Sequence, residues 1–118
     1  MIQSFRDLEV YRRSFEASVE MYQLTKSYPR DELYGLTSQI KRAATSIPLN
    51  IAEGYGKKET PDDFKRFLLM AIGSCNEMRV LLDLSARLGF IDETVHQKYE
   101  REYEEIGKML TSLRMRWK

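Results

Sequence analysis

Apolar side chains in the middle of the chain recur at spacings of three and four residues, which is the repeat of one face of an α-helix. They are Leu36, Ile40, Ala43, Ile47 and Ile51. Beside this stripe runs a polar row at similar spacing, which comprises Gln39, Arg42, Ser46, Asn50 and Glu53. A polar row so close to a core stripe is either the rim of the core or part of a contact with another molecule. The segment predicts an amphipathic helix that begins near position 31 or 33 and ends at about position 55.

Pro48 lies inside this predicted helix, where a proline disturbs the backbone. Its ring removes one N–H donor, crowds the carbonyl of Ala44 and is expected to kink the helix axis at a cost of roughly 3 kcal/mol. We expect such a bend to serve packing or function. The helix is expected to end in the segment Gly54–Lys57, where a glycine suits a left-handed C-cap.

Three further helices are predicted from the same repeat. The first spans residues 7–26, stops before Pro29 and directs five side chains to the core, namely Leu8, Tyr11, Phe15, Val19 and Tyr22. The third begins at Thr60 and stops at Gly89. The fourth begins at Asp92, and its apolar stripe comprises Val95, Tyr99, Tyr103, Ile106, Leu110, Leu113 and Trp117. No segment shows the strict alternation of a half-buried strand.

Four helices joined by short connections predict an all-α fold, an antiparallel up-down-up-down four-helix bundle, in a single domain over residues 1–118. The third helix has an apolar surplus, because 16 of the 27 residues from Phe64 to Phe90 are apolar. A bundle helix with one buried stripe needs about three in seven. A helix that is apolar on two sides is either the central helix of an asymmetrically packed monomer or part of a contact between subunits. We expect self-association, through the side chains that lie off its main stripe: Leu69, Met70, Val80 and Leu84.

Composition and charge narrow the class of protein. Apolar residues make up 42% of the chain and charged residues 31%, which is typical of a globular protein rather than a disordered one. No uncharged run, including the one before Glu77, is longer than ten residues, about half of a membrane span. A lone cysteine, Cys75, excludes an internal disulfide, and no basic-then-apolar leader opens the chain. We therefore expect a cytoplasmic protein without a membrane partner.

Few residues are suited to catalysis. His96 is the only histidine and Cys75 the only thiol, and Cys75 falls on the apolar stripe of the third helix, where a cysteine is usually inert. Glu53 and Glu77 are the only acids that lie centrally in otherwise apolar or small-residue stretches of helix, and they would suit general acid–base chemistry as a pair. The alternative is a polar network of Arg42, Glu53 and Glu77, together with Asn50 and Gln39, that fixes helix register. We favour the network and expect no enzymatic activity, metal, cofactor or small-molecule substrate.

Two smaller features concern contacts between helices and with nucleic acid. Gly73 lowers the helix propensity of the third helix by about 1 kcal/mol relative to alanine and is expected to permit close helix approach, against the second helix.

Basic residues come in pairs, although the net charge is only +1. Repeated around a ring, such pairs would bind phosphate backbones, whereas on a monomer they are more often solvated. The candidate nucleic-acid contacts are Lys41, Arg42, Lys57, Lys58, Lys65 and Arg66.

Several segments of the chain resemble one protein family over nearly its whole length. The matching segments are Phe5–Tyr11 (FRDLEVY), Tyr34–Thr37 (YGLT), Gln39–Ala44 (QIKRAA) and Ser46–Gly54 (SIPLNIAEG), followed by Phe67–Leu68, Gly73–Ser74, Glu77 and Leu88–Phe90. On these residues the chain resembles the 23S rRNA intervening-sequence proteins, also called the four helix bundle protein family.

The resemblance implies a small bacterial four-helix protein that assembles as a ring-like homopentamer. Many members are encoded within insertions in large-subunit ribosomal RNA genes. Relatives of similar fold act as accessory proteins of diversity-generating retroelements, where a basic pentamer engages a reverse transcriptase and RNA. The sequence as a whole predicts a non-enzymatic, self-assembling scaffold protein. The alternative is an accessory protein that binds RNA, or an RNA-bound protein, through a ring of basic patches.

Overall fold

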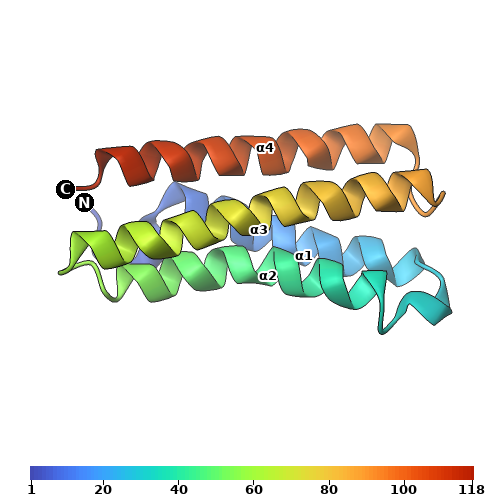
Figure 1. Cartoon of the computed structure of the whole chain (residues 1–118), viewed down its shortest axis with the longest axis horizontal. Coiled ribbons are helices and arrows are strands. Elements are labelled where there is room, and N and C mark those ends of the chain that lie inside the picture. The colour runs from blue at the N-terminus through green and yellow to red at the C-terminus, as the bar shows by residue number, and fades with distance from the viewer.

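Four long α-helices and three short 3-10 turns make up the secondary structure, and no strand is present. The structure, a computed structural model, describes residues 1–118. Its helices are α1 (Glu9–Leu24), α2 (Leu36–Tyr55), α3 (Pro61–Arg87) and α4 (Glu93–Arg116), and its turns are η1 (Phe5–Asp7), η2 (Thr25–Ser27) and η3 (Arg30–Glu32). Consecutive helices run antiparallel, and both termini lie at the same end of the bundle (Figure 1). The predicted all-α four-helix bundle is confirmed.

The helix ends follow the expected local chemistry in part, since Thr60 precedes α3 without a side-chain cap hydrogen bond. Asp92 caps α4 as predicted, because its Oδ1 accepts a hydrogen bond from the backbone N–H of Val95 at 2.9 Å. Gly89 follows α3 with φ of +82°, a left-handed conformation that ends the helix. Gly56 follows α2 with φ of −63°, so the predicted left-handed cap at this end is wrong. The chain leaves α2 through right-handed turns that lead directly into α3.

The order of the helices around the bundle places α1 and α3 on opposite corners. α2 packs against both α1 and α3, α3 packs against α4, and α4 closes on α1 through fewer residues. The predicted stripe of α2 is buried, as is that of α3, with Ile40, Ile47 and Phe64 fully enclosed. In α4 the centre of the stripe, from Tyr99 to Leu110, is buried and its two ends are half-buried. The core therefore follows the sequence pattern in three of the four helices.

The inward face of α1 differs from the prediction. Phe15, Val19 and Tyr22 were expected in the core, but their exposed fractions are 46%, 43% and 43%. The buried residues of α1 are instead mostly small, and comprise Val10, Ser14, Ala17, Ser18 and Met21. Small side chains let α1 lie close to α2, and the large apolar side chains then fall outside this contact. The outer surface of α1 is consequently apolar.

Ser18 explains how the bundle accommodates Pro48 within a continuous α2. Pro48 has no N–H, so the buried carbonyl of Ala44 lacks its usual partner within the helix. The hydroxyl of Ser18, on α1, lies 2.9 Å from this carbonyl oxygen and 2.9 Å from the carbonyl of Ser14. The hydroxyl has one proton to share between these two carbonyls, and it is the donor from the neighbouring helix that can replace the lost backbone bond. The bend that Pro48 predicts in the helix axis stays a prediction.

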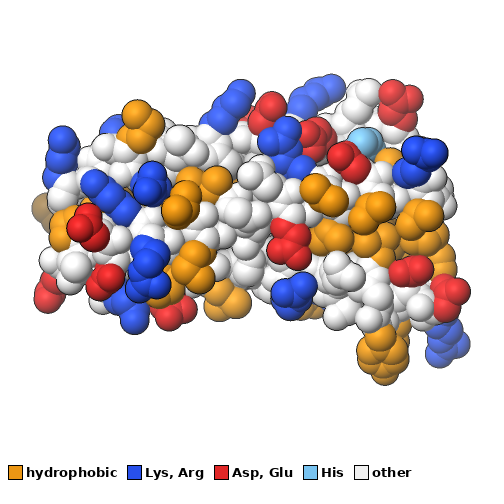
Figure 2. Space-filling model, viewed as in Figure 1, with side chains coloured by type: hydrophobic (Ala, Val, Ile, Leu, Met, Phe, Trp, Pro, Cys, Tyr) orange, Lys and Arg blue, Asp and Glu red, His pale blue; other side chains and the backbone are white.

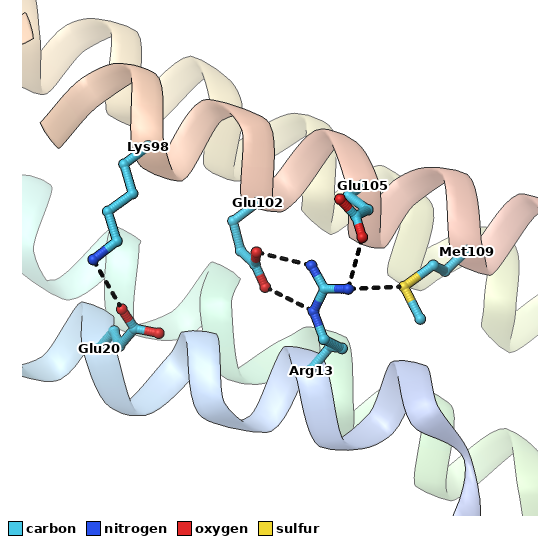
Figure 3. Close-up of polar contacts among 6 residues, drawn as sticks. All are labelled: Arg13, Glu20, Lys98, Glu102, Glu105 and Met109. Carbon is cyan, nitrogen blue, oxygen red and sulfur yellow. Dashed lines mark hydrogen bonds and ion pairs between the residues drawn. The ribbon is translucent and has the colours of Figure 1, made fainter. Parts of the chain in front are cut away.

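The contact between α1 and α4 carries several charged pairs along its edge. The guanidinium of Arg13 donates two hydrogen bonds to the carboxylate of Glu102, at 2.9 and 3.1 Å, and one to Glu105 at 2.8 Å. Farther along, Lys98 pairs with Glu20 at 3.8 Å. Figure 3 shows Arg13 reaching from α1 between Glu102, Glu105 and Met109 of α4. Charged groups therefore join the first and last helices along the edge of this contact.

The stability of this contact is expected to depend on pH. The hydrogen bond and the charge of Arg13 lower the pKa of Glu105. A carboxyl whose pKa is lower in the folded state stabilises that state above its unfolded pKa, and the gain is lost as pH falls through the folded pKa. We expect Glu105→Gln to lower the thermal midpoint at about pH 7 and to leave it unchanged at about pH 2. Glu16→Gln, at an exposed carboxylate of α1, is the matched control. A deficit that persists in acid would contradict the assignment.

Candidate interaction surfaces

The outer face of α3 is apolar, as the surplus in the sequence predicts. Leu69, Met70, Val80 and Leu84 have exposed fractions of 51%, 49%, 57% and 46%, and we call these four side chains the α3 ridge. Figure 2 shows hydrophobic side chains along α3 on the face toward the viewer, in two groups separated by other side chains. Leu88, which is 57% exposed, continues this face beyond the end of the helix. The four predicted oligomer contacts therefore lie together on one surface of a single subunit.

Gly73 lies in the middle of the α3 ridge and faces open space. A Cβ atom added at this position would meet no atom within 4 Å, so the predicted close approach of Gly73 to another helix of the same subunit is wrong. Glycine inside a helix costs about 1 kcal/mol relative to alanine. No contact within the subunit offsets that cost.

A second apolar surface, the α1–α2 groove, lies between the outer faces of α1 and α2. It encloses about 570 Å³, and none of its eleven lining residues is charged. They are Phe5, Tyr11, Phe15, Ser18, Val19, Tyr22, Gln23, Thr45, Pro48, Leu49 and Ala52. Leu49 is 65% exposed and is the most exposed large apolar side chain of α2. The sequence pattern placed Phe15, Val19 and Tyr22 in the core, so this surface was not predicted.

The predicted polar row lies on the surface between α2 and α3 and forms only part of the expected network. Arg42 pairs with Glu77 at 3.6 Å. The hydroxyl of Ser46 lies 2.6 Å from that of Ser74, and the amide of Asn50 donates to the carbonyl of Ser46 at 2.8 Å. The other two members, Gln39 and Glu53, are exposed and join neither contact.

The candidate acid–base pair of Glu53 and Glu77 is not formed. Glu77 lies level with Arg42, with which it pairs, whereas Glu53 follows Arg42 by eleven residues along α2. At 1.5 Å per residue this offset is about 17 Å, too far for the two carboxylates to act together. The arrangement therefore offers no paired acid and base.

The other candidate catalytic residues are also separated by their contacts. Cys75 is buried against α4, and this burial raises the pKa of its thiol to about 12, so the thiolate is scarce at neutral pH. The imidazole Nε2 of His96 lies 2.8 Å from a carboxylate oxygen of Asp83.

No group of three or more histidine, cysteine, aspartate or glutamate side chains is placed to hold a metal ion. No helix is long and apolar enough to cross a membrane.

The basic candidates divide into two places. Lys57, Lys58, Lys65 and Arg66 lie around the turn between α2 and α3, next to the end of α4, where Arg114 donates to the carbonyl of Lys65 at 3.3 Å. Lys41 and Arg42 lie about four turns away along α2. There the ammonium of Lys41 lies over the ring of Tyr22, at the margin of the groove and 4.9 Å from the ring centre, and Arg42 pairs with Glu77. The acids Glu59, Asp62 and Asp63 stand among the first group, so this end has mixed charge. RNA binding here stays a prediction.

Known proteins support the fold and assign a family. A family model described as 23S rRNA-intervening sequence protein matches residues 6–112. The structure is similar to a 1.70 Å crystal structure of a protein with unknown function from the S23 ribosomal protein family of Bacteroides thetaiotaomicron, with 28% identity and a TM-score of 0.81 over 90% of this chain and 95% of that one. The comparison with curated proteins finds no match. Since the family model spans nearly the whole sequence, the chain belongs to the 23S rRNA-intervening sequence protein family.

Proposed function

We propose that this chain is a non-enzymatic, self-assembling scaffold protein of the bacterial cytoplasm, whose subunits associate through the α3 ridge. The observation that carries the proposal is the exposure of four large apolar side chains, each about half exposed, on one face of one helix. Soluble monomers rarely leave a contiguous apolar patch of several hundred Å² uncovered. The surfaces described above offer apolar contacts for a partner.

The energetics favour burial of this face. Fully burying a leucine, valine or methionine side chain contributes roughly 1.5–3 kcal/mol, so four half-exposed side chains contribute about 3–6 kcal/mol from one partner. Association costs at least about 4 kcal/mol in lost translational and rotational freedom. An interface that buries comparable apolar side chains on both partners therefore exceeds the lower estimates of that cost. Gly73, without a contact inside its subunit, fits such an interface because a partner helix can approach it closely.

Closed rotational symmetry is the usual arrangement of identical subunits. The resemblance of the sequence to its family favours a ring of five. A ring presents the same surface of each subunit five times, which suits a scaffold that holds several copies of a partner.

The mass of the purified protein in solution tests the proposal. At tens of micromolar we expect light scattering coupled to size exclusion to give a multiple of the 13.9 kDa subunit mass, five-fold for the proposed ring. The double variant Leu69→Glu/Val80→Glu should give a folded species of 13.9 kDa, because it places charges in the ridge. Thr94→Glu/Arg101→Glu, at two exposed positions of α4, is the control and should keep the wild-type mass. A wild-type mass of one subunit would contradict the proposal.

A further inference from the structure

We infer that the α1–α2 groove is the docking site for the α3 ridge of a second copy of this chain, so that the subunits associate head to tail. The inference rests on the proposed self-assembly and adds to it the surface that receives the ridge. It concerns a part of the molecule that the sequence pattern assigned to the core, namely the outer side chains of α1.

The two surfaces match in chemistry. The groove is lined without a single charged side chain, although charged residues make up 31% of the sequence. Phe15, Val19 and Leu49 are 46%, 43% and 65% exposed there, and the ridge exposes its four apolar side chains to a similar degree. Glu77 lies on the same face of α3, between Gly73 and Val80, but it is paired with Arg42 at 3.6 Å. An uncharged groove therefore accepts the apolar side chains of the ridge without desolvating an unpaired charge, which would be costly. The occupant is therefore apolar, and the chain itself carries an apolar helix face that lacks a partner.

The two surfaces also match in length and shape. From Leu69 to Leu84 the ridge covers fifteen residues of helix, or about 22 Å. From Tyr11 to Tyr22 the α1 side of the groove covers eleven residues, or about 17 Å. Gly73 lacks a Cβ in the middle of the ridge and has no atom within 4 Å of that position. The two helices that form the groove can therefore come close to the α3 backbone at this point.

The position of the two surfaces favours a head-to-tail contact over a symmetric one. α1 and α3 occupy opposite corners of the bundle, so the groove and the ridge are separate surfaces of one subunit. A symmetric dimer that joins ridge to ridge would leave Phe15, Val19, Tyr22 and Leu49 exposed on both subunits. In a head-to-tail ring every subunit uses both surfaces, so each buries about twice as many large apolar side chains. Head-to-tail contacts close into rings when the rotation between subunits permits it.

A mixing experiment between two blocked variants tests the inference. The ridge-blocked variant is Leu69→Glu/Val80→Glu, and the groove-blocked variant is Phe15→Glu/Val19→Glu, with Leu49→Glu as a second groove variant at a more exposed position. We expect each variant alone to be a folded monomer, with folding checked by circular dichroism. An equimolar mixture should double in mass to a dimer. The intact ridge of one variant docks in the intact groove of the other, and the two blocked surfaces stop further growth.

The possible outcomes separate this inference from the proposed function. Groove variants that keep the wild-type mass while the ridge variant is a monomer would overturn the inference and leave self-assembly through the ridge intact. A dimer of two blocked variants lacks the contact that closes the ring, and this loss is allowed to weaken association by about 3 kcal/mol, or about a hundred-fold in concentration. A mixture that remains monomeric up to about a hundred times the concentration at which the wild type assembles would therefore also overturn the inference. A wild-type protein that is itself monomeric would overturn both.

Discussion

Replacing Gly54 by alanine is expected to destabilise the folded subunit by about 3 kcal/mol, the upper end of the usual cost of overpacking a core. Gly54 is buried near the end of α2, where α3 crosses closely. An added Cβ would lie 2.6 Å from the Cβ of Phe67 and 2.9 Å from a ring carbon of Phe64. The Cβ of Phe67 is fixed to the α3 backbone, so a rotamer change cannot relieve the clash. The two helices would have to move apart.

The midpoint of urea denaturation, followed by circular dichroism, measures this effect. Both glycine variants are best compared in the ridge-blocked background, which removes any contribution of assembly. Gly73→Ala is the matched control, since its Cβ would enter open space inside a helix. That control should stabilise the subunit by up to about 1 kcal/mol, through helix propensity alone. Equal midpoints for Gly54→Ala and its parent would show that α2 and α3 are less closely packed than the structure indicates.

Replacing Ser18 by alanine is expected to destabilise the subunit by about 2 kcal/mol, because it leaves the buried carbonyl of Ala44 without a partner. The cost should depend on Pro48. In a Pro48→Ala background the backbone N–H of residue 48 is restored and can donate to Ala44, so the loss on removing the hydroxyl should be much smaller. A double-mutant cycle on these two positions measures the coupling directly.

Ser14→Ala is the control for this cycle. Its buried hydroxyl donates only to the carbonyl of Tyr11 within α1, at 3.0 Å, and so supports no group on α2. Its cost should therefore be the same whether residue 48 is proline or alanine. If Ser18→Ala also had the same cost in both backgrounds, the hydroxyl would not be the partner that Pro48 makes necessary.

Three helices were predictable because large apolar residues mark their buried faces. In α2, Ile40, Ile47 and Ile51 repeat at helical spacing and are fully enclosed. The pattern failed for α1 because that helix has two candidate faces, one of large apolar residues and one with serine and alanine. Size favoured the first face, but close approach to α2 requires the second, with Ser14 and Ala17 buried.

The candidate surfaces were predictable to different degrees for a related reason. The α3 ridge follows from a single helix, since an apolar surplus on two sides can be counted along the sequence. The α1–α2 groove involves two helices, and it appears only when the outer faces of α1 and α2 are placed side by side.

The left-handed cap predicted after α2 was wrong at Gly56, because the next helix follows through tight right-handed turns.

The polar contact between α1 and α4 has a consequence for the order of folding. It joins residues 89 and 92 positions apart, as in the pairs of Arg13 with Glu102 and Glu105, whereas the other helix contacts join consecutive helices. Closing a long loop has a larger entropy cost than closing a short one, so the three helical hairpins are expected to form before the first and last helices meet. Interactions that form after the transition state act mainly on the unfolding rate. We therefore expect Arg13 and its carboxylate partners to slow the opening of the finished bundle and to leave the rate of its formation nearly unchanged.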